Sequence, residues 1–411
     1  MRVIATLLAL VCLTGTAPAQ VRTENATCAR TLSEQPLRQT LIVIDGAMVA
    51  PDTDNGPSAK NQNWRRFLTS LLNPSGPNSS NSFSPNEPVT VAIASSDGAS
   101  LSPIFQGCMP IVSAAEAEKL DSQTSSLDTF IGRDWRSRHK KQAETFLNSL
   151  VMASVEGINN VSIGGTEKVR FTESGLIESM QRNPMISLDK GIPRILILTD
   201  MDLYTFPNGD ITTIRAAARS EGIRGGGNFL RAETHIFAQG LGQHDQLDAY
   251  LKPYFLSQQA NLVSIGSFGA ALPSNSQPTS VSVFQGVADF PQGTYPMRMR
   301  LAKDQSNSIV NSWVEVQSDQ NRFVPFNGLL NCQTDTQCEY IGDRVFAQIW
   351  SDNPNPEPEC LQWMAFAGMR ELSFSIEGEQ ITGNVSDPAC EIVGREEGIS
   401  FKLTKVSNGL F

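Results

Sequence analysis

Two aspartates stand at the ends of short apolar runs, and these residues are the best placed in the chain for chemistry. Residues 41–44 lead into Asp45, and residues 195–199 lead into Asp200. Apolar runs of this length are typical of buried parallel strands, whose carboxyl ends meet at one ligand-facing edge of an α/β sheet. The pattern predicts that both carboxylates lie at that edge, where they would bind a cation, cap helix N-termini or accept backbone N–H bonds.

The elements that would position these acids alternate between helical and strand periods. Helical stripes occupy 64–72, 143–155, 176–180, the segment from Ile211 after its N-cap Asp210, and 247–255, where Pro253 interrupts the helix. Further buried strands are expected at 89–94, 234–240 and 261–265, with a long polar insertion after the first. This alternation predicts a mostly parallel, doubly wound sheet covered on both faces.

Three short segments give this half of the chain a resemblance to the von Willebrand factor A domain. Asp45 follows the first strand, Thr172 precedes a helix, and Thr199-Asp200-Met201-Asp202 follows a later strand. The resemblance covers roughly residues 38 to 268. It implies a ligand-binding edge formed by Asp45, Thr172, Asp200 and Asp202, with Asp45, Thr172 and Asp200 as the metal contacts.

The chain departs from the family pattern where the metal would be held. The family has two serines after the first aspartate that coordinate a divalent cation, and Ala47 and Val49 stand here instead. Neither side chain carries an oxygen, which magnesium requires of its ligands. We therefore expect at most weak Mg²⁺ binding at a degenerate site, and no other cofactor.

The hydrophobic pattern changes at about residue 273. Met297, Met299 and Leu301 alternate with polar residues at a period of two, and apolar runs recur around 345–350, 372–376 and 401–403. We expect an all-β sandwich or barrel over residues 273–411, preceded by the von Willebrand factor A-like α/β domain over 38–272. We expect the linker between them to be Ser274 to Ser280.

The N-terminus has the features of an export signal. Arg2 precedes an apolar stretch, and Ala17-Pro18-Ala19 provides the small residues that signal peptidase requires. Residues 1–19 are therefore predicted to be a signal peptide that includes Cys12, and residues 20–37 an N-terminal leader segment. No membrane-spanning segment is expected in the mature chain. The predicted location is periplasmic or extracellular.

Cysteine usage agrees with an oxidising compartment. The six cysteines after the signal peptide are Cys28, Cys108, Cys332, Cys338, Cys360 and Cys390. An even number in an exported chain predicts disulfides, and the absence of CxxC pairs argues against zinc. Sequence permits 15 pairings of six cysteines. Chain proximity favours Cys28 with Cys108, Cys332 with Cys338, and Cys360 with Cys390.

Charge and motif content narrow the function classes. The formal net charge of −10 argues against general binding of nucleic acid or anionic membranes and favours a protein partner. A basic cluster between Arg133 and Lys141 is interpreted as a solvated helix face. The three histidines form no HxxxH pair, and no serine lies in a GxSxG elbow.

Three functions from different classes remain. We favour a non-enzymatic protein-binding or adhesion module that presents loops at the acidic edge. One alternative is a structural or assembly component of a periplasmic or cell-surface complex, which would not need a metal site. The other is an unrecognised hydrolase. The sequence does not indicate the oligomeric state.

Overall fold

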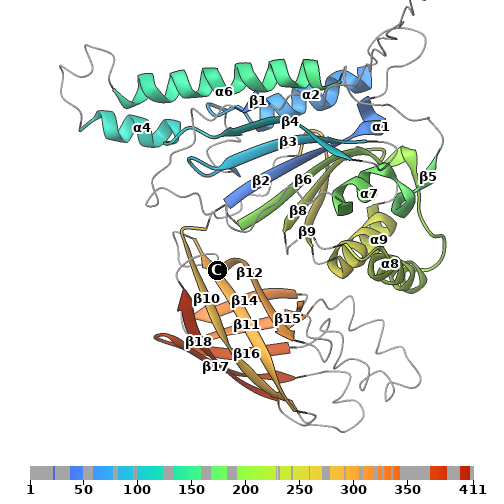
Figure 1. The fold of residues 1–411 in the computed structure, drawn as a ribbon, viewed down its shortest axis with the longest axis vertical. Helices are drawn as coiled ribbons and strands as arrows, with labels where there is room; N and C mark the ends of the chain where they lie inside the picture. The colour runs from blue at the N-terminus through green and yellow to red at the C-terminus, as the bar shows by residue number, and fades with distance from the viewer. Residues whose placement is uncertain are drawn as a thin grey trace, which may run out of the picture.

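A computed structural model gives the fold, which consists of a mixed α/β part followed by an all-antiparallel β part (Figure 1). The structure describes residues 22–23, 38–49, 59–76, 82–95, 98, 100–123, 134–158, 168–182, 192–227, 229, 232–241, 244–258, 260–270, 278–290, 293–304, 309–317, 323–325, 328–334, 337–342, 371–386 and 399–407.

The first part is built on a seven-stranded sheet. In spatial order its strands are β1 (Arg22–Thr23), β4 (Leu101–Cys108), β3 (Pro88–Ala94), β2 (Arg38–Asp45), β6 (Ile192–Asp200), β8 (Glu233–Gln239) and β9 (Asn261–Ser267). The five strands from β3 to β9 are parallel, whereas β4 runs antiparallel to β3. β2 and β6, the two acid-tipped strands, lie in one parallel sheet, as the sequence predicts, and the structure shows that they are direct neighbours.

Helices cover both faces of this sheet. Successive side chains of a strand point to opposite sides, so strands made of consecutive apolar residues present an apolar surface on each face. Ile42 and Ile44 of β2 pack with α2 (Ala59–Leu71) and α6 (Trp135–Ile158). Leu41 and Val43 pack on the opposite face with α7 (Gly175–Arg182), α8 (Ile211–Gly225) and α9 (His244–Ser257). The short helices α1 (Gly46–Val49) and α4 (Ala114–Asp121) also belong to this part. The predicted two-faced α/β sheet is confirmed.

Three details of the sequence interpretation are wrong. The polar insertion after β3 contains the strand β4 and the helix α4. The helix α9 runs through Pro253 without interruption. Val151 and Val155 belong to the outer face of α6 and are 44% and 48% exposed, because the stripe that packs against the sheet passes through Phe146 and Leu150.

The described residues of the second part form one nine-stranded antiparallel sheet. In spatial order its strands are β13 (Phe323–Pro325), β12 (Ile309–Gln317), β11 (Gly293–Lys303), β10 (Ser280–Phe290), β18 (Ile399–Ser407), β17 (Gln380–Ser386), β16 (Glu371–Glu377), β15 (Gln337–Gly342) and β14 (Gly328–Thr334). β13 and β14 stand at opposite ends of this order, yet only residues 326–327 separate them in the chain. The sheet must therefore curl until its two ends approach each other.

An apolar cluster lies on one face of this sheet. Phe284, Met299, Val314 and Leu403 belong to it and come from four different strands. A smaller cluster of Ile192, Val281 and Ala302 joins the start of β6 to β10 and β11. The amino ends of the parallel strands therefore face the β part, as Figure 1 shows, and the carboxyl ends face away from it.

Several predictions concern residues outside the described ranges. These include the signal peptide over 1–19, most of the leader segment over 20–37, most of the proposed linker, the run at 345–350, and Cys28, Cys360 and Cys390. The domain boundary between residues 272 and 273 also falls there. Within the described residues, no helix combines the length and apolarity that crossing a membrane requires.

Candidate functional site

The candidate site lies at the carboxyl edge of the parallel strands. Asp45 is the last residue of β2, and Asp200 is the last residue of β6. Because Ile44 lies opposite Leu198 in the register, the two acids end neighbouring strands one residue out of step. Both are buried, with 2% and 4% of their surfaces exposed. The prediction that the two acids share one edge is confirmed.

The carboxylate of Asp45 is held by protein groups on both oxygens. The Thr199 hydroxyl donates to Oδ2 at 2.7 Å, and the Tyr204 hydroxyl donates to the same oxygen at 2.5 Å. The backbone N–H of Ala47 donates to Oδ1 at 3.0 Å. Burial raises the pKa of Asp45 above its ordinary value, although these three hydrogen bonds oppose the shift, and the charge of Asp200 adds to it.

Tyr204 is the residue at this edge that sequence reasoning missed. The 3₁₀-helix η3 (Met201–Leu203) follows β6 and leads into the two-residue strand β7 (Tyr204–Thr205), which pairs with β5 (Val169–Arg170). The ring of Phe171 packs edge-on against the Tyr204 ring at 5.3 Å. Burial and the neighbouring Asp45 raise the pKa of Tyr204 well above its usual range. The phenol therefore stays protonated and acts as a donor to Asp45.

The other two predicted edge residues lie nearby in different environments. Thr172 is half-buried in the 3₁₀-helix η2 (Phe171–Glu173), and none of the described contacts joins its side chain to Asp45 or Asp200. Asp202 is exposed, and its backbone N–H donates to Oδ1 of Asp200 at 3.1 Å. Gly240 passes so close to Asp202 that an added Cβ would lie 2.5 Å from the carboxyl carbon.

The residues at this edge do not fit the oxygen-rich cage that a divalent cation such as Mg²⁺ requires. Hydroxyl and N–H donors already occupy Asp45 on both oxygens. Val49 is one of the two residues that stand where a serine ligand would be needed. Its side chain is buried in the apolar cluster that includes residues of α2. No group of three or more His, Cys, Asp or Glu side chains gathers as a metal site within the described part of the chain. Weak or absent cation binding stays a prediction.

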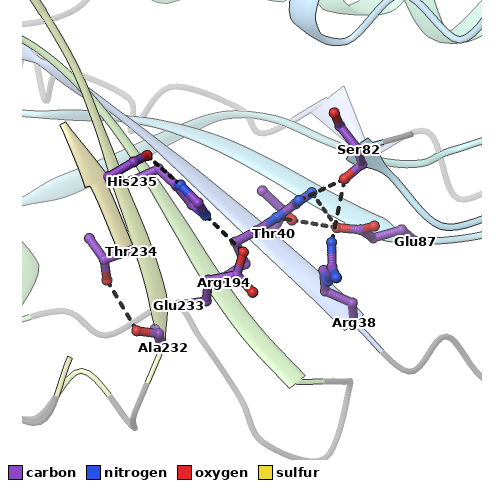
Figure 2. A network of polar contacts seen from close by, with 10 residues as sticks. Arg38, Thr40, Ser82, Glu87, Arg194, Ala232, Glu233, Thr234 and His235 are labelled. Atoms are coloured by element: carbon purple, nitrogen blue, oxygen red, sulfur yellow. Dashed lines mark hydrogen bonds and ion pairs between the residues drawn. The ribbon is translucent and has the colours of Figure 1, made fainter. Parts of the chain in front are cut away.

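A second polar cluster lies at the opposite, amino edge of the sheet (Figure 2). Arg194 of β6 donates to Oε1 of Glu87 at 3.0 Å and to the carbonyl of Ser82 at 2.6 Å. Its Nε also donates to the Thr40 hydroxyl at 2.9 Å, and Thr40 in turn donates to Glu87. Burial lowers the pKa of Arg194 to about 10, although Glu87 opposes the shift. Arg194 therefore remains charged at neutral pH.

Glu233 and His235 continue this cluster into β8. Nε2 of His235 lies 2.8 Å from Glu233, and Nδ1 lies 2.8 Å from the Ser264 hydroxyl of β9. Burial alone would raise the pKa of Glu233, but the hydrogen bond from His235 and the charges of Arg38, His235 and Arg194 together lower it well below its usual range. The cluster is buried, so we interpret it as a connection between strands and not as a binding surface.

Two further sequence interpretations concern the helix α6 and Cys108. In the basic cluster of α6, Arg136 lies 3.5 Å from Asp121, and Lys140 lies 4.0 Å from Glu144. Arg136, Lys140 and Glu144 are exposed, whereas Asp121 is largely buried, and the exposed cations agree with a solvated helix face. Cys108 is buried and disulfide-bonded. The β14–β15 register places Cys332 directly opposite Cys338, as a bridge between them would require.

No protein-family model matches this chain, and no curated protein shows significant sequence similarity to it. The function must therefore be inferred from the geometry of the chain itself.

Proposed function

We propose that this chain is an exported, non-enzymatic protein-binding or adhesion module whose carboxyl edge acts with weak or no dependence on divalent cations. One observation carries the proposal: Thr199, Tyr204 and the Ala47 N–H satisfy the Asp45 carboxylate at the edge where a cation would otherwise be needed. Three hydrogen bonds already stabilise this carboxylate, so a bound metal would add little further stabilisation. The edge then presents a fixed protein surface to its partner.

We further propose that the α/β part is a degenerate von Willebrand factor A-like domain. The strand order, the helices on both faces and the position of Asp45 after β2 support this proposal. The all-β part, proposed to span 273–411, would orient that domain from the amino edge of its strands, where Ile192 meets Val281 and Ala302. Its curled single sheet favours a barrel over a two-sheet sandwich.

Affinity capture from the native envelope tests the proposed binding edge. The bait is the full mature chain, and the edge variant is Asp202→Lys, because Asp202 is exposed and its charge can be reversed without disturbing the core. Glu377→Lys, at an exposed position of β16, is the matched control. We expect a partner that wild type and control retain in the presence of a chelator and that Asp202→Lys loses. Equal capture by both variants, or release by the chelator, would contradict the proposal.

A structural or assembly role in a periplasmic or cell-surface complex is the second candidate. The burial of Val49 favours it, because this position has become part of the core and no longer faces a ligand. The same capture experiment discriminates the two roles. A partner that Asp202→Lys still binds, and that charge reversals elsewhere on the surface release, would favour the structural role over a binding edge.

A further inference from the structure

The connection from β7 to α8 contains an asparagine followed by a glycine. Asn208 and Gly209 are both exposed, and they lie on the carboxyl side of β6, after Asp200 and η3. The chain has three other Asn-Gly pairs, at 55, 327 and 408, whose asparagines fall outside the described residues. Asn208-Gly209 is therefore the one such pair within the described part of the chain.

The groups that would react at this pair are exposed to solvent. No hydrogen bond within the described residues holds the side-chain amide of Asn208 or the backbone N–H of Gly209. Gly209 adopts a φ of 152°, a conformation that residues with a Cβ rarely adopt. An added Cβ would also lie 3.1 Å from Thr213. The position therefore requires glycine, the residue that least obstructs attack by its own nitrogen.

We propose that Asn208 is a site of spontaneous deamidation. The backbone nitrogen of Gly209 loses its proton to solvent and attacks Cγ of Asn208, forming a C–N bond. The Cγ–Nδ2 bond then breaks, and the side-chain nitrogen leaves as ammonia after it takes up a proton. Water opens the resulting succinimide at one of its two C–N bonds, giving either aspartate or isoaspartate. The net change consumes one water and releases one ammonia, so it needs no oxidant, reductant or enzyme.

The product would alter the start of α8. Oδ1 of Asp210 accepts the N–H of Thr213 at 2.7 Å and caps this helix, and the hydrogen bond lowers the pKa of Asp210. Isoaspartate at 208 lengthens the main chain by one methylene group immediately before Gly209 and this cap. Either product adds a negative charge beside the acidic edge. The effect on a partner rests on the proposed function, whereas the deamidation itself does not.

Peptide mapping of aged protein by mass spectrometry tests the site directly. The full mature chain is incubated at pH 8.5 and 37 °C and then digested, and the peptide with Asn208 is examined for aspartate and isoaspartate. We expect both products to accumulate in that peptide, while the exposed Asn384, which precedes a β-branched valine, stays unchanged. Asn208→Gln should abolish the products, because its longer side chain would have to form a less favoured six-membered ring.

An unmodified Asn208 in folded protein, when the same peptide deamidates after unfolding in urea, would overturn the proposal. The consequence for binding is measured separately with Asn208→Asp in the capture experiment. Loss of capture by that variant would support control of the binding edge. Unchanged capture would remove that consequence and leave the modification site itself intact.

Discussion

The carboxyl group of Asp45 is buried, so its protonation is linked to folding. Its pKa in the folded chain lies above the ordinary value of 3.8, and the folded state therefore binds the proton more tightly than the unfolded state. The free energy of unfolding must fall as the pH rises from the ordinary pKa to the raised one. Above the raised pKa that part of the stability is fully lost.

The variant Asp45→Asn tests this linkage. Asparagine does not titrate, so the stability of the variant relative to wild type should increase with pH above 4, at a slope of at most about 1.4 kcal/mol per pH unit. Urea unfolding at pH 4, 5.5 and 7 measures the difference. Asp202→Asn, which alters an exposed acid, is the control and should show no such trend. A difference that is independent of pH for both variants would mean that Asp45 ionises like an exposed carboxyl.

The sequence predicts the positions of Asp45 and Asp200 but not Tyr204, whose hydroxyl donates a hydrogen bond to Asp45. Asp45 and Asp200 are recognisable because each ends an apolar run. Tyr204 lies 159 residues from Asp45 in the chain, on a strand of two residues that has no periodicity to detect. The available signal is a tyrosine among apolar residues just after an acid-tipped strand. That signal indicates that the tyrosine is buried, but it does not identify the residue that accepts a hydrogen bond from the tyrosine hydroxyl.

Among the elements, β6 is paired with β2 through the backbone, and the side chain of Arg194 adds contacts to β2 and to the segment before β3. The guanidinium joins Thr40, the Ser82 carbonyl and Glu87 inside the protein. Removing one partner of a buried ion pair leaves the other charge without compensation, which is more costly than removing both.

A double-mutant cycle on this pair should therefore be strongly non-additive. We expect Arg194→Met to lower the free energy of unfolding by about 3–5 kcal/mol, and Glu87→Gln in that background to restore part of the loss. Lys252→Met is the control: the Lys252–Asp248 pair has the same type of contact at 2.8 Å but is partly exposed, and its loss should cost about 0.5 kcal/mol or less. Denaturant unfolding of the four cycle members and the control measures these values. Additive losses at 194 and 87 would show that the two charges are not coupled.

The errors in the element assignment have physical causes. β4 contains Pro103 and Gly107, which weaken a strand pattern, and the sheet accommodates Pro103 at a register irregularity opposite Ala92. α9 tolerates Pro253 because that residue and its neighbours Tyr254 and Phe255 are buried. Local propensity is outweighed by packing in both cases, and packing cannot be read from the local sequence.

For the whole molecule, the redox state of the compartment determines whether disulfides form. Thiol titration of unfolded, non-reduced protein should find no free thiols in material from an oxidising compartment. Each bridge should contribute about 2–4 kcal/mol to stability. The disulfide at Cys108 agrees with this expectation, and pairing with Cys28 would fasten the segment after β1 to the end of β4. Four or more free thiols would contradict it.

The change of hydrophobic period at about residue 273 predicts the order of the two parts correctly, because a period of two distinguishes half-buried strands from buried ones. The sequence could not predict that the β part forms one curled sheet. That arrangement follows from a pairing order in which consecutive strands β13 and β14 occupy opposite ends. Such pairing leaves no local signal in the residues.

Calorimetric titration measures whether the carboxyl edge binds a divalent cation, which the proposed function does not require. Mg²⁺ and Mn²⁺ are titrated into the wild-type chain and into the Asp45→Ala and Asp200→Ala variants, each first checked for folding by circular dichroism. We expect no micromolar binding in any of the three, because Thr199, Tyr204 and Ala47 already donate hydrogen bonds to the Asp45 carboxylate. Micromolar binding by the wild type that disappears in both folded variants would contradict the proposed function and would indicate a metal-dependent edge.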